Sequence, residues 1–301
     1  MFFCVDAFTS AFPTAYAMFA GGYDFSADLK ITQKYVIATD AVGTGTNLSA
    51  VISYAFYGGT ESIAISAGGR VVTTYTTVSE KYTYASDTVA AGGSLTGTAR
   101  GDAGSTSTAT TGYFAGGNTN TAAFTPTSQV TKYTFSSDAT AAGTALTVAK
   151  YAMPGCGNSS VGIFAGGFDG VNPIATTQKY TYSGDTTGAG TALTAARSSS
   201  AAAGCPTYGV ITQGGAPVAT TRKYTYSGDV EAAGTSATYS VSRSAMTSTS
   251  AFGLLGLGST GGAAVKTTNK YNWSTEAVTT GTSLGTAVFA STATSMSIGN
   301  L

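Results

Sequence analysis

The sequence predicts an all-β fold, and three observations lead to this prediction. A lysine–tyrosine pair recurs six times along the 301 residues, at spacings of 44 to 51 residues. Aromatic or branched residues alternate with polar residues around each pair, and Gly, Ser and Asp gather between the apolar stretches. No stretch of useful length has the apolar spacing of an amphipathic helix. A period in this range is typical of repeat architectures.

The repeat unit is longer than the pair itself. An acidic residue follows each tyrosine by five positions, a glycine follows after five more, and a leucine (once alanine) stands three beyond. Four copies then have a basic residue: Arg100, Lys150, Arg197 and Arg243. The pairs are Lys34-Tyr35, Lys81-Tyr82, Lys132-Tyr133, Lys179-Tyr180, Lys223-Tyr224 and Lys270-Tyr271; the acidic residues are Asp40, Asp87, Asp138, Asp185, Asp229 and Glu276; the glycines are Gly45, Gly92, Gly143, Gly190, Gly234 and Gly281.

Each unit is expected to form four short strands. The first is rich in small residues, the second ends in a double glycine, the third holds the lysine–tyrosine pair, and the fourth carries the leucine. Tyr82 and Tyr84 stand two residues apart, so they share one face of the third strand. Thr, Tyr, Val and Phe suit a pleated surface, and Ser183-Gly184-Asp185 has the composition of a turn.

Six units of four strands match the blades of a β-propeller. The chain begins its repeat at a second strand, around residues 18–22, and residues 290–301 look like a first strand without a successor. We therefore expect residues 16–301 to form one six-bladed propeller of antiparallel blades, closed by pairing of the N- and C-terminal segments. Residues 1–15 are the least repeat-like part, and we expect an N-terminal lead that packs across a face or contacts a partner.

The order of the elements resembles that of kelch-type propellers. In that family a double glycine ends the second strand, and an aromatic-bearing third strand follows after a variable loop. Gly21-Gly22, Gly116-Gly117 and Gly166-Gly167 match this order, but the single tryptophan, Trp273, stands in a different strand from the kelch tryptophan. The composition is similar to Gly-, Thr- and Ala-rich kelch-like repeats of phage fibre and surface proteins. This resemblance implies a virion role.

Composition excludes several functions. Charged residues make up 9% of the chain, against about 25% in typical proteins. Lys plus Arg and Asp plus Glu are balanced at 14 each, so a nucleic-acid partner is not expected. The chain has no histidine, which removes Ser-His-Asp and Cys-His catalysis, histidine metal sites and the histidine-dependent copper-radical oxidase activity of some kelch-type propellers. Paired-carboxylate chemistry stays open. We expect no enzyme activity and no cofactor.

The repeated side chains each have two interpretations. The aspartates could bind calcium, but one carboxylate per turn is poor for an ion that takes six to eight oxygens, so we favour a cap on the aspartate's own turn. The lysines could line a cationic channel, but we favour packed stems with solvated or aspartate-paired ammonium groups. The tyrosines are expected to pack between blades. For Cys156 and Cys205 we favour free thiols, and a bridge between adjacent blades stays open.

The loops after the double glycines vary most, and variable loops on a rigid scaffold often carry recognition. Carbohydrate is a plausible ligand, because aromatic faces and Asn or Asp groups suit sugar rings and hydroxyls. The candidate ligand-binding residues are Asp24, Asn118, Asn120 and Asp169. No metal or catalytic residue is expected.

The leading functional hypothesis is a non-enzymatic structural or receptor-binding component of a phage virion or tail fibre. The start of the chain lacks the features of a secretion signal, and no apolar run is long enough to span a membrane. We therefore expect assembly in the host cytoplasm and an extracellular location after release. Expected partners are other virion proteins and a host cell-surface glycan, and homo-oligomerisation is left open. The alternatives are a lectin-like or adhesion module and, third, a polysaccharide lyase or glycosidase.

Overall fold

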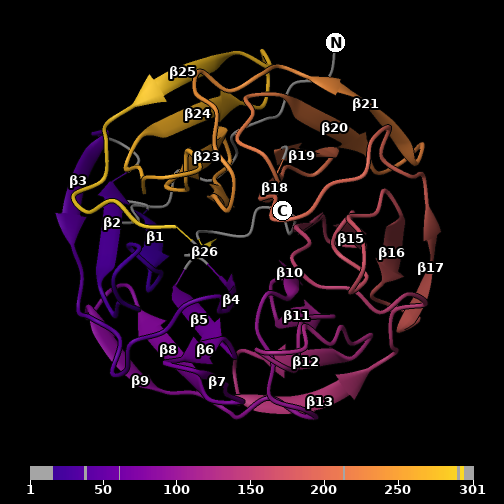
Figure 1. The fold of residues 1–301 in the computed structure, drawn as a ribbon, viewed down its shortest axis with the longest axis horizontal. Coiled ribbons are helices and arrows are strands. Elements are labelled where there is room, and N and C mark those ends of the chain that lie inside the picture. The colour runs from indigo at the N-terminus through magenta and orange to yellow at the C-terminus, as the bar shows by residue number, and fades with distance from the viewer. Residues whose placement is uncertain (1–15, 37–38, 61, 213, 290–291, 295–301) are drawn as a thin grey trace.

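A computed structural model describes residues 16–36, 39–60, 62–212, 214–289 and 292–294. Six four-stranded antiparallel sheets stand around a central axis, and the described residues contain no helix (Figure 1). In order from the axis outward, the blades are β26 (Thr292–Thr294), β1 (Tyr16–Ala20), β2 (Thr32–Val36) and β3 (Ala41–Thr44) in blade 1; β4 (Phe56–Gly59), β5 (Ile63–Ala67), β8 (Ser79–Thr83) and β9 (Thr88–Ala91) in blade 2; β10 (Gly104–Ser107), β11 (Thr111–Ala115), β12 (Val130–Thr134) and β13 (Ala139–Gly143) in blade 3; β14 (Gly155–Gly157), β15 (Val161–Ala165), β16 (Thr177–Thr181) and β17 (Thr186–Gly190) in blade 4; β18 (Ala202–Gly204), β19 (Tyr208–Thr212), β20 (Thr221–Thr225) and β21 (Val230–Gly234) in blade 5; and β22 (Ala245–Ser248), β23 (Phe252–Gly256), β24 (Thr268–Asn272) and β25 (Val278–Gly281) in blade 6.

The ring closes through strands from the two ends of the chain. β26 pairs antiparallel with β1, with Met18 opposite Thr294 and Ala20 opposite Thr292. This strand covers the inner edge of β1, which would otherwise present unpaired backbone groups. The predicted all-β, six-bladed propeller and its closure are therefore confirmed. The predicted N-terminal lead, residues 1–15, lies outside the described residues.

One part of the strand prediction is wrong. The leucine of each unit does not stand in the fourth strand but in the connection that follows it, where it is buried. Leu146, for example, comes after β13, and its backbone N–H donates to the carbonyl of Ser128 at 2.8 Å, just before β12. The fourth strands themselves contain mostly Ala, Thr and Gly and are largely exposed. They form the outer rim of the ring, where no core is available to bury their side chains.

The core lies between the blades rather than inside them. Phe56 and Ile65 of blade 2 pack with Phe114 and Tyr133 of blade 3 in one cluster. Comparable clusters join the other blades, and Phe19 of blade 1 with Leu254 of blade 6 belongs to the one that closes the ring. The predicted inter-blade packing of the tyrosines is thus confirmed. Because neither partner sheet can bury its face alone, the ring is the folding unit.

The lysine, tyrosine, acid and glycine of the repeat form one inter-blade contact, which we call the clasp. Lys132 Nζ of blade 3 lies 2.6 Å from Asp185 Oδ2 of blade 4, and Tyr180 Oη donates to Asp185 Oδ1. A Cβ at Gly143 would stand 2.6 Å from Tyr180 Oη, so glycine leaves room for the neighbour's hydroxyl. Within the described residues, five lysines make this ion pair: Lys34–Asp87, Lys81–Asp138, Lys132–Asp185, Lys223–Glu276 and Lys270–Asp40.

The clasp revises our interpretation of the repeated aspartates. We expected each side chain to cap its own turn, but Asp185 also accepts a hydrogen bond from the backbone N–H of Thr144 in the preceding blade at 3.2 Å. The aspartates do stand in turns, with left-handed backbones at a φ of +55° for Asp138 and +47° for Asp185. The turn aims the carboxylate across the interface. The lysines pair with these aspartates, as favoured.

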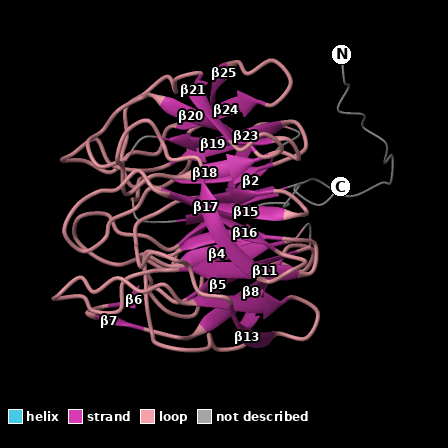
Figure 2. Ribbon diagram, turned by 90° about the vertical axis from the view of Figure 1, so that its right-hand side faces the viewer, coloured by secondary structure: helices cyan, strands magenta, loops and turns pink. Residues whose placement is uncertain are grey.

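The two faces of the ring differ in their connections. One face has short turns, whereas the other has the longer loops that join second to third strands and fourth strands to the next blade. Figure 2 shows these longer loops on the left, with the small hairpin of β6 (Arg70–Val71) and β7 (Thr74–Tyr75) extending from blade 2. We call this the long-loop face.

The thiols of Cys156 and Cys205 are both buried and free, as favoured. Burial raises the pKa of the Cys156 thiol to about 12. The described part of the chain has no helix that is long and apolar enough to cross a membrane.

Candidate functional site

The connections on the long-loop face are held by the loops beside them. Gly101, in the connection into blade 3, exchanges two backbone hydrogen bonds with Asn118, at 3.0 and 2.8 Å. The preceding residue, Gly117, has a φ of +113°, and a Cβ there would stand 2.9 Å from the Gly101 carbonyl oxygen. Only glycine combines this backbone with this close approach. The same exchange joins Ser53 with Arg70, Tyr151 with Phe168, Ser242 with Ser259, and Phe289 with Tyr23.

Asp102, which follows Gly101, and the equivalent residues of four other described connections form a ring around the axis. The five described members have left-handed backbones, with φ between +51° and +57°. From the second member to the fifth, each backbone N–H donates to the carbonyl of the member in the preceding blade, at 2.7 to 2.9 Å. We call these residues the axial ring: Tyr54, Asp102, Ala152, Ser199 and Arg243. Positive φ is uncommon outside glycine, so five in series show that the fold imposes the backbone while the side chain is free to vary.

A cavity of about 480 Å³ lies over the axial ring, and the loops of the long-loop face complete its walls. This volume is within the range of small-molecule sites, roughly 300–1,000 Å³. Five aromatic residues line it: Tyr54, Tyr75, Phe124, Tyr151 and Phe168. The Phe124 and Tyr151 rings are stacked at 6.4 Å with an interplanar angle of 18°, and the Phe168 ring is 5.4 Å from that of Tyr151.

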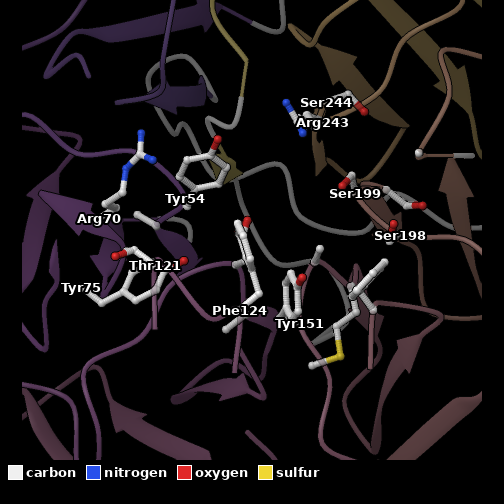
Figure 3. Close-up of a pocket in the computed structure, with 18 residues that line it drawn as sticks. Tyr54, Arg70, Tyr75, Thr121, Phe124, Tyr151, Ser198, Ser199, Arg243 and Ser244 are labelled. Atoms are coloured by element: carbon white, nitrogen blue, oxygen red, sulfur yellow. The ribbon is translucent and has the colours of Figure 1, made fainter. Parts of the chain in front are cut away.

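Hydroxyl groups line this axial pocket together with the aromatic rings. Ser199 and Ser244 line it from blades 5 and 6, and Figure 3 shows them across the pocket from Tyr75 and Thr121. The Tyr75 hydroxyl is held in place, because Asn118 Nδ2 donates to it at 2.9 Å. The walls therefore combine flat apolar faces with groups that donate and accept hydrogen bonds.

Two arginines line the pocket, and their surroundings differ. Arg70 Nη2 lies 3.1 Å from Asp28 Oδ1, and its guanidinium stands over the Tyr54 ring at 4.9 Å. Arg243 is exposed, and its guanidinium lies 5.7 Å from the centre of the Phe289 ring. Among the described residues no carboxylate forms an ion pair with Arg243. Arg70 is thus neutralised by the protein, whereas Arg243 is available to a ligand.

Asp102 is the one acidic residue among those that line the pocket. Its side chain keeps some surface open to the cavity but is otherwise enclosed by protein, and this desolvation raises its pKa to about 7. The charges of Arg243 and Arg70 act in the opposite direction without cancelling the effect. Asp102 enters blade 3 and Arg243 enters blade 6, so in a ring of six they stand on opposite sides of the axis (Figure 1).

None of the four predicted ligand-binding residues is among those that line this pocket. Asp24, Asn120 and Asp169 accept hydrogen bonds from backbone N–H groups two and three residues ahead, so they shape the tips of their loops. Asn118 is buried and positions Tyr75. The loops of Asn118, Asn120 and Asp169 do supply pocket residues, because Phe124 follows Asn120 and Phe168 precedes Asp169. The loop of Asp24 supplies none. Whether the four contact a ligand stays a prediction.

The axial ring is what sequence reasoning missed, and a misalignment contributed. We grouped Arg243 with Arg100, Lys150 and Arg197, but Arg243 stands two positions further along its connection. The other three are buried, and Lys150 Nζ donates to the carbonyls of Phe164 at 2.9 Å and Thr176 at 3.1 Å. The sequence did contain a signal for the axial ring. The position two residues after that of Arg100, Lys150 and Arg197 holds Tyr, Asp, Ala, Ser and Arg in the connections into blades 2 to 6.

Among the described residues, no three acidic or cysteine side chains gather in a way that could hold a metal ion. No protein-family model matches the chain, and no curated protein is significantly similar to it. The site must therefore be interpreted from its own chemistry.

Proposed function

We propose that the chain is a non-enzymatic binding module that holds a carbohydrate in the axial pocket. The observation that carries the proposal is the composition of one cavity, in which stacked aromatic rings, several hydroxyl groups and the carboxyl group of Asp102 face the same space. A sugar ring offers an apolar face of C–H groups and a rim of hydroxyls. Aromatic side chains suit the first, and hydroxyl and carboxyl groups suit the second.

The scaffold supports this role because the pocket residues need little reorganisation on binding. The axial ring is tied together by backbone hydrogen bonds, and each connection is bonded to a neighbouring loop. Such preorganisation reduces the entropy lost on binding. The proposal places the ligand at the axis, with the loops of Asn118, Asn120 and Asp169 forming its rim.

The test is a binding measurement on the full chain, by glycan array followed by titration calorimetry of the sugars that bind. Phe124 and Phe25 form a matched pair for substitution, because both are exposed aromatics with positive φ in equivalent loops, and only Phe124 lines the pocket. Phe124→Ala should weaken binding about five- to tenfold, the order expected for one stacking contact. Phe25→Ala should leave the affinity unchanged. Equal effects of the two substitutions, or no binding to any glycan, would contradict the proposal.

The enzyme alternative has less support. Among the described lining residues Asp102 is the one carboxyl group, and paired-carboxylate glycosidases use two. Release of reducing ends from a polysaccharide, abolished by Asp102→Asn, would restore that alternative.

A structural role in a phage virion or tail fibre is the second candidate. It is supported by the kelch-like order of the elements and by an outer rim of small, nearly uncharged residues, which suits dense packing against neighbours. Exposed strand edges are commonly protected by charge, yet the fourth strands hold one acidic residue, Glu231, which is paired with Arg222. Failure of the free chain to bind glycans, together with its presence in regular copy number in a purified particle, would favour this role.

A further inference from the structure

We propose that the axial pocket prefers sugars that carry a carboxylate, with the carboxylate bound by Arg243 and the ring hydroxyls turned toward Asp102. This inference rests on the proposed function and adds the chemical class of the ligand.

The preference for a carboxylate depends on Arg243. It belongs to the axial ring, so its backbone is held by the hydrogen bond that its N–H donates to the Ser199 carbonyl at 2.9 Å. Its side chain lines the pocket and is exposed, and the described residues offer it no ion pair. The other pocket cation, Arg70, is already paired with Asp28. A carboxylate in the pocket would therefore meet one guanidinium that is free to make the bidentate contact typical of arginine.

The surroundings of Arg243 leave room for such a contact. Figure 3 shows Arg243 near Ser244, across from Tyr54, with Arg70 on the far side of the tyrosine. The Ser199 hydroxyl lies on the same side of the pocket as Arg243 and can share the carboxylate. The stacked rings of Phe124 and Tyr151 come from blades 3 and 4, so they offer a wall for the face of the sugar.

Asp102 gives the preference a pH signature. The titratable and charged groups that act on it are Arg243 and Arg70, and it acts in turn on the hydroxyls of Tyr54, Tyr75 and Tyr151. All three tyrosines have raised pKa values, chiefly through desolvation, so they stay neutral near pH 7. Asp102 is the one acidic residue that lines the pocket, and it forms no ion pair with Arg243. Protonation of Asp102 therefore removes the negative charge that would repel an anionic sugar. An anionic sugar should bind more tightly as the pH falls through about 7.

The experiment compares each acidic sugar with a neutral counterpart, called its parent below. The pairs are glucuronic acid with glucose, galacturonic acid with galactose, and N-acetylneuraminic acid with its methyl ester. Affinities of the full chain are measured by titration calorimetry at pH 6 and pH 8. At least one acid should bind about tenfold more tightly than its parent, in line with one charged hydrogen-bonded pair. Its affinity should be several-fold higher at pH 6 than at pH 8, and the parent's affinity should not rise at pH 6.

Three substitutions locate the effect. Arg243→Gln should remove the preference for the acid over its neutral counterpart, and Arg243→Lys should keep part of it. Asp102→Asn should remove the pH dependence, and asparagine tolerates the left-handed backbone at this position. Lys266→Gln is the control, because it removes an exposed cation from the loop between β23 and β24 on the long-loop face, and Lys266 does not line the pocket. Melting curves of each variant check that it is folded.

The outcomes separate the two proposals. Neutral sugars that bind as tightly as the acids, or an acid preference that survives Arg243→Gln, would overturn this inference and leave the proposed function standing. Failure of every sugar to bind, acidic or neutral, would overturn both. Acid binding that weakens toward pH 6 would overturn the assignment of Asp102.

Discussion

Lys270 Nζ of the last blade lies 2.9 Å from Asp40 Oδ2 of the first, so the clasp that links neighbouring blades also links the two ends of the chain. The same contact therefore repeats across a boundary that no local sequence signal marks. Together with the pairing of β26 and β1, it makes the closing interface equivalent to the others.

Substitution Lys270→Met should cost about 0.5–1 kcal/mol of unfolding free energy, because both partners are partly exposed and such pairs are weak. Urea unfolding at low salt and at 1 M salt measures it. The difference between wild type and variant should shrink at high salt, where the pair is screened. A loss that is independent of salt would show that the lysine acts through its packed stem instead.

Substitution Gly143→Ala should destabilise the protein by about 1–3 kcal/mol, because the new methyl group would stand 2.6 Å from Tyr180 Oη of the next blade. Tyr180→Phe removes that hydroxyl, so the double variant should recover part of the loss. Gly188→Ala is the control, since a Cβ there meets nothing within 4 Å. Urea denaturation of the four variants gives the coupling energy, and strictly additive losses would contradict the clasp geometry.

Burial lowers the pKa of the Lys150 ammonium to about 7. Between about pH 7 and pH 9.5 the unfolded chain therefore holds a proton on Lys150 that the folded protein has released. The free energy of unfolding should rise with pH in this window, by up to about 1.4 kcal/mol per unit. Lys150→Met and Lys150→Arg should both abolish the slope, the arginine by staying charged as Arg100 does in blade 3. Urea denaturation at each pH measures it, and a slope that persists in both variants would refute the assignment.

The raised pKa of Asp102 predicts that the free energy of unfolding changes in the opposite direction at lower pH. Its folded pKa of about 7 lies above the ordinary aspartate value, so between about pH 4 and pH 7 the folded protein holds a proton that the unfolded chain has released. The free energy of unfolding should fall as the pH rises through this window. Together, the slopes due to Asp102 and Lys150 place a minimum in the free energy of unfolding near pH 7. Asp102→Asn should flatten the acidic side alone, and a variant that keeps the slope would contradict the prediction.

The parts of the fold that the sequence predicted are those encoded by repetition. Six copies of the Lys132-Tyr133 type, with glycine and acid at constant spacing, predicted the number of blades and their four strands, because equal units must bury equal faces against each other. The leucines were assigned to the wrong element, since a buried apolar residue beside a strand has the same local pattern whether it continues the strand or follows it. The aspartate contacts were incomplete for a related reason: a turn residue looks the same when its side chain reaches the next blade.

The candidate site shows where such reasoning stops. Asn118, Asn120 and Asp169 were chosen because their loops depart from the repeat, and these loops do surround the pocket. Tyr54, Asp102 and Arg243 were not chosen, because they lie far apart in the sequence, in connections that look ordinary one at a time.

By itself, the amino-acid order determined the repeated strands, the inter-blade contacts and the absence of histidine chemistry, because each depends on residue type or on short, regular spacing. The tertiary structure alone decided that one variable residue from each of five described connections meets the others at the axis. The reason is geometric: closing six blades into a ring brings equivalent backbone positions together, and only there do an aspartate and an arginine from opposite blades face the same cavity.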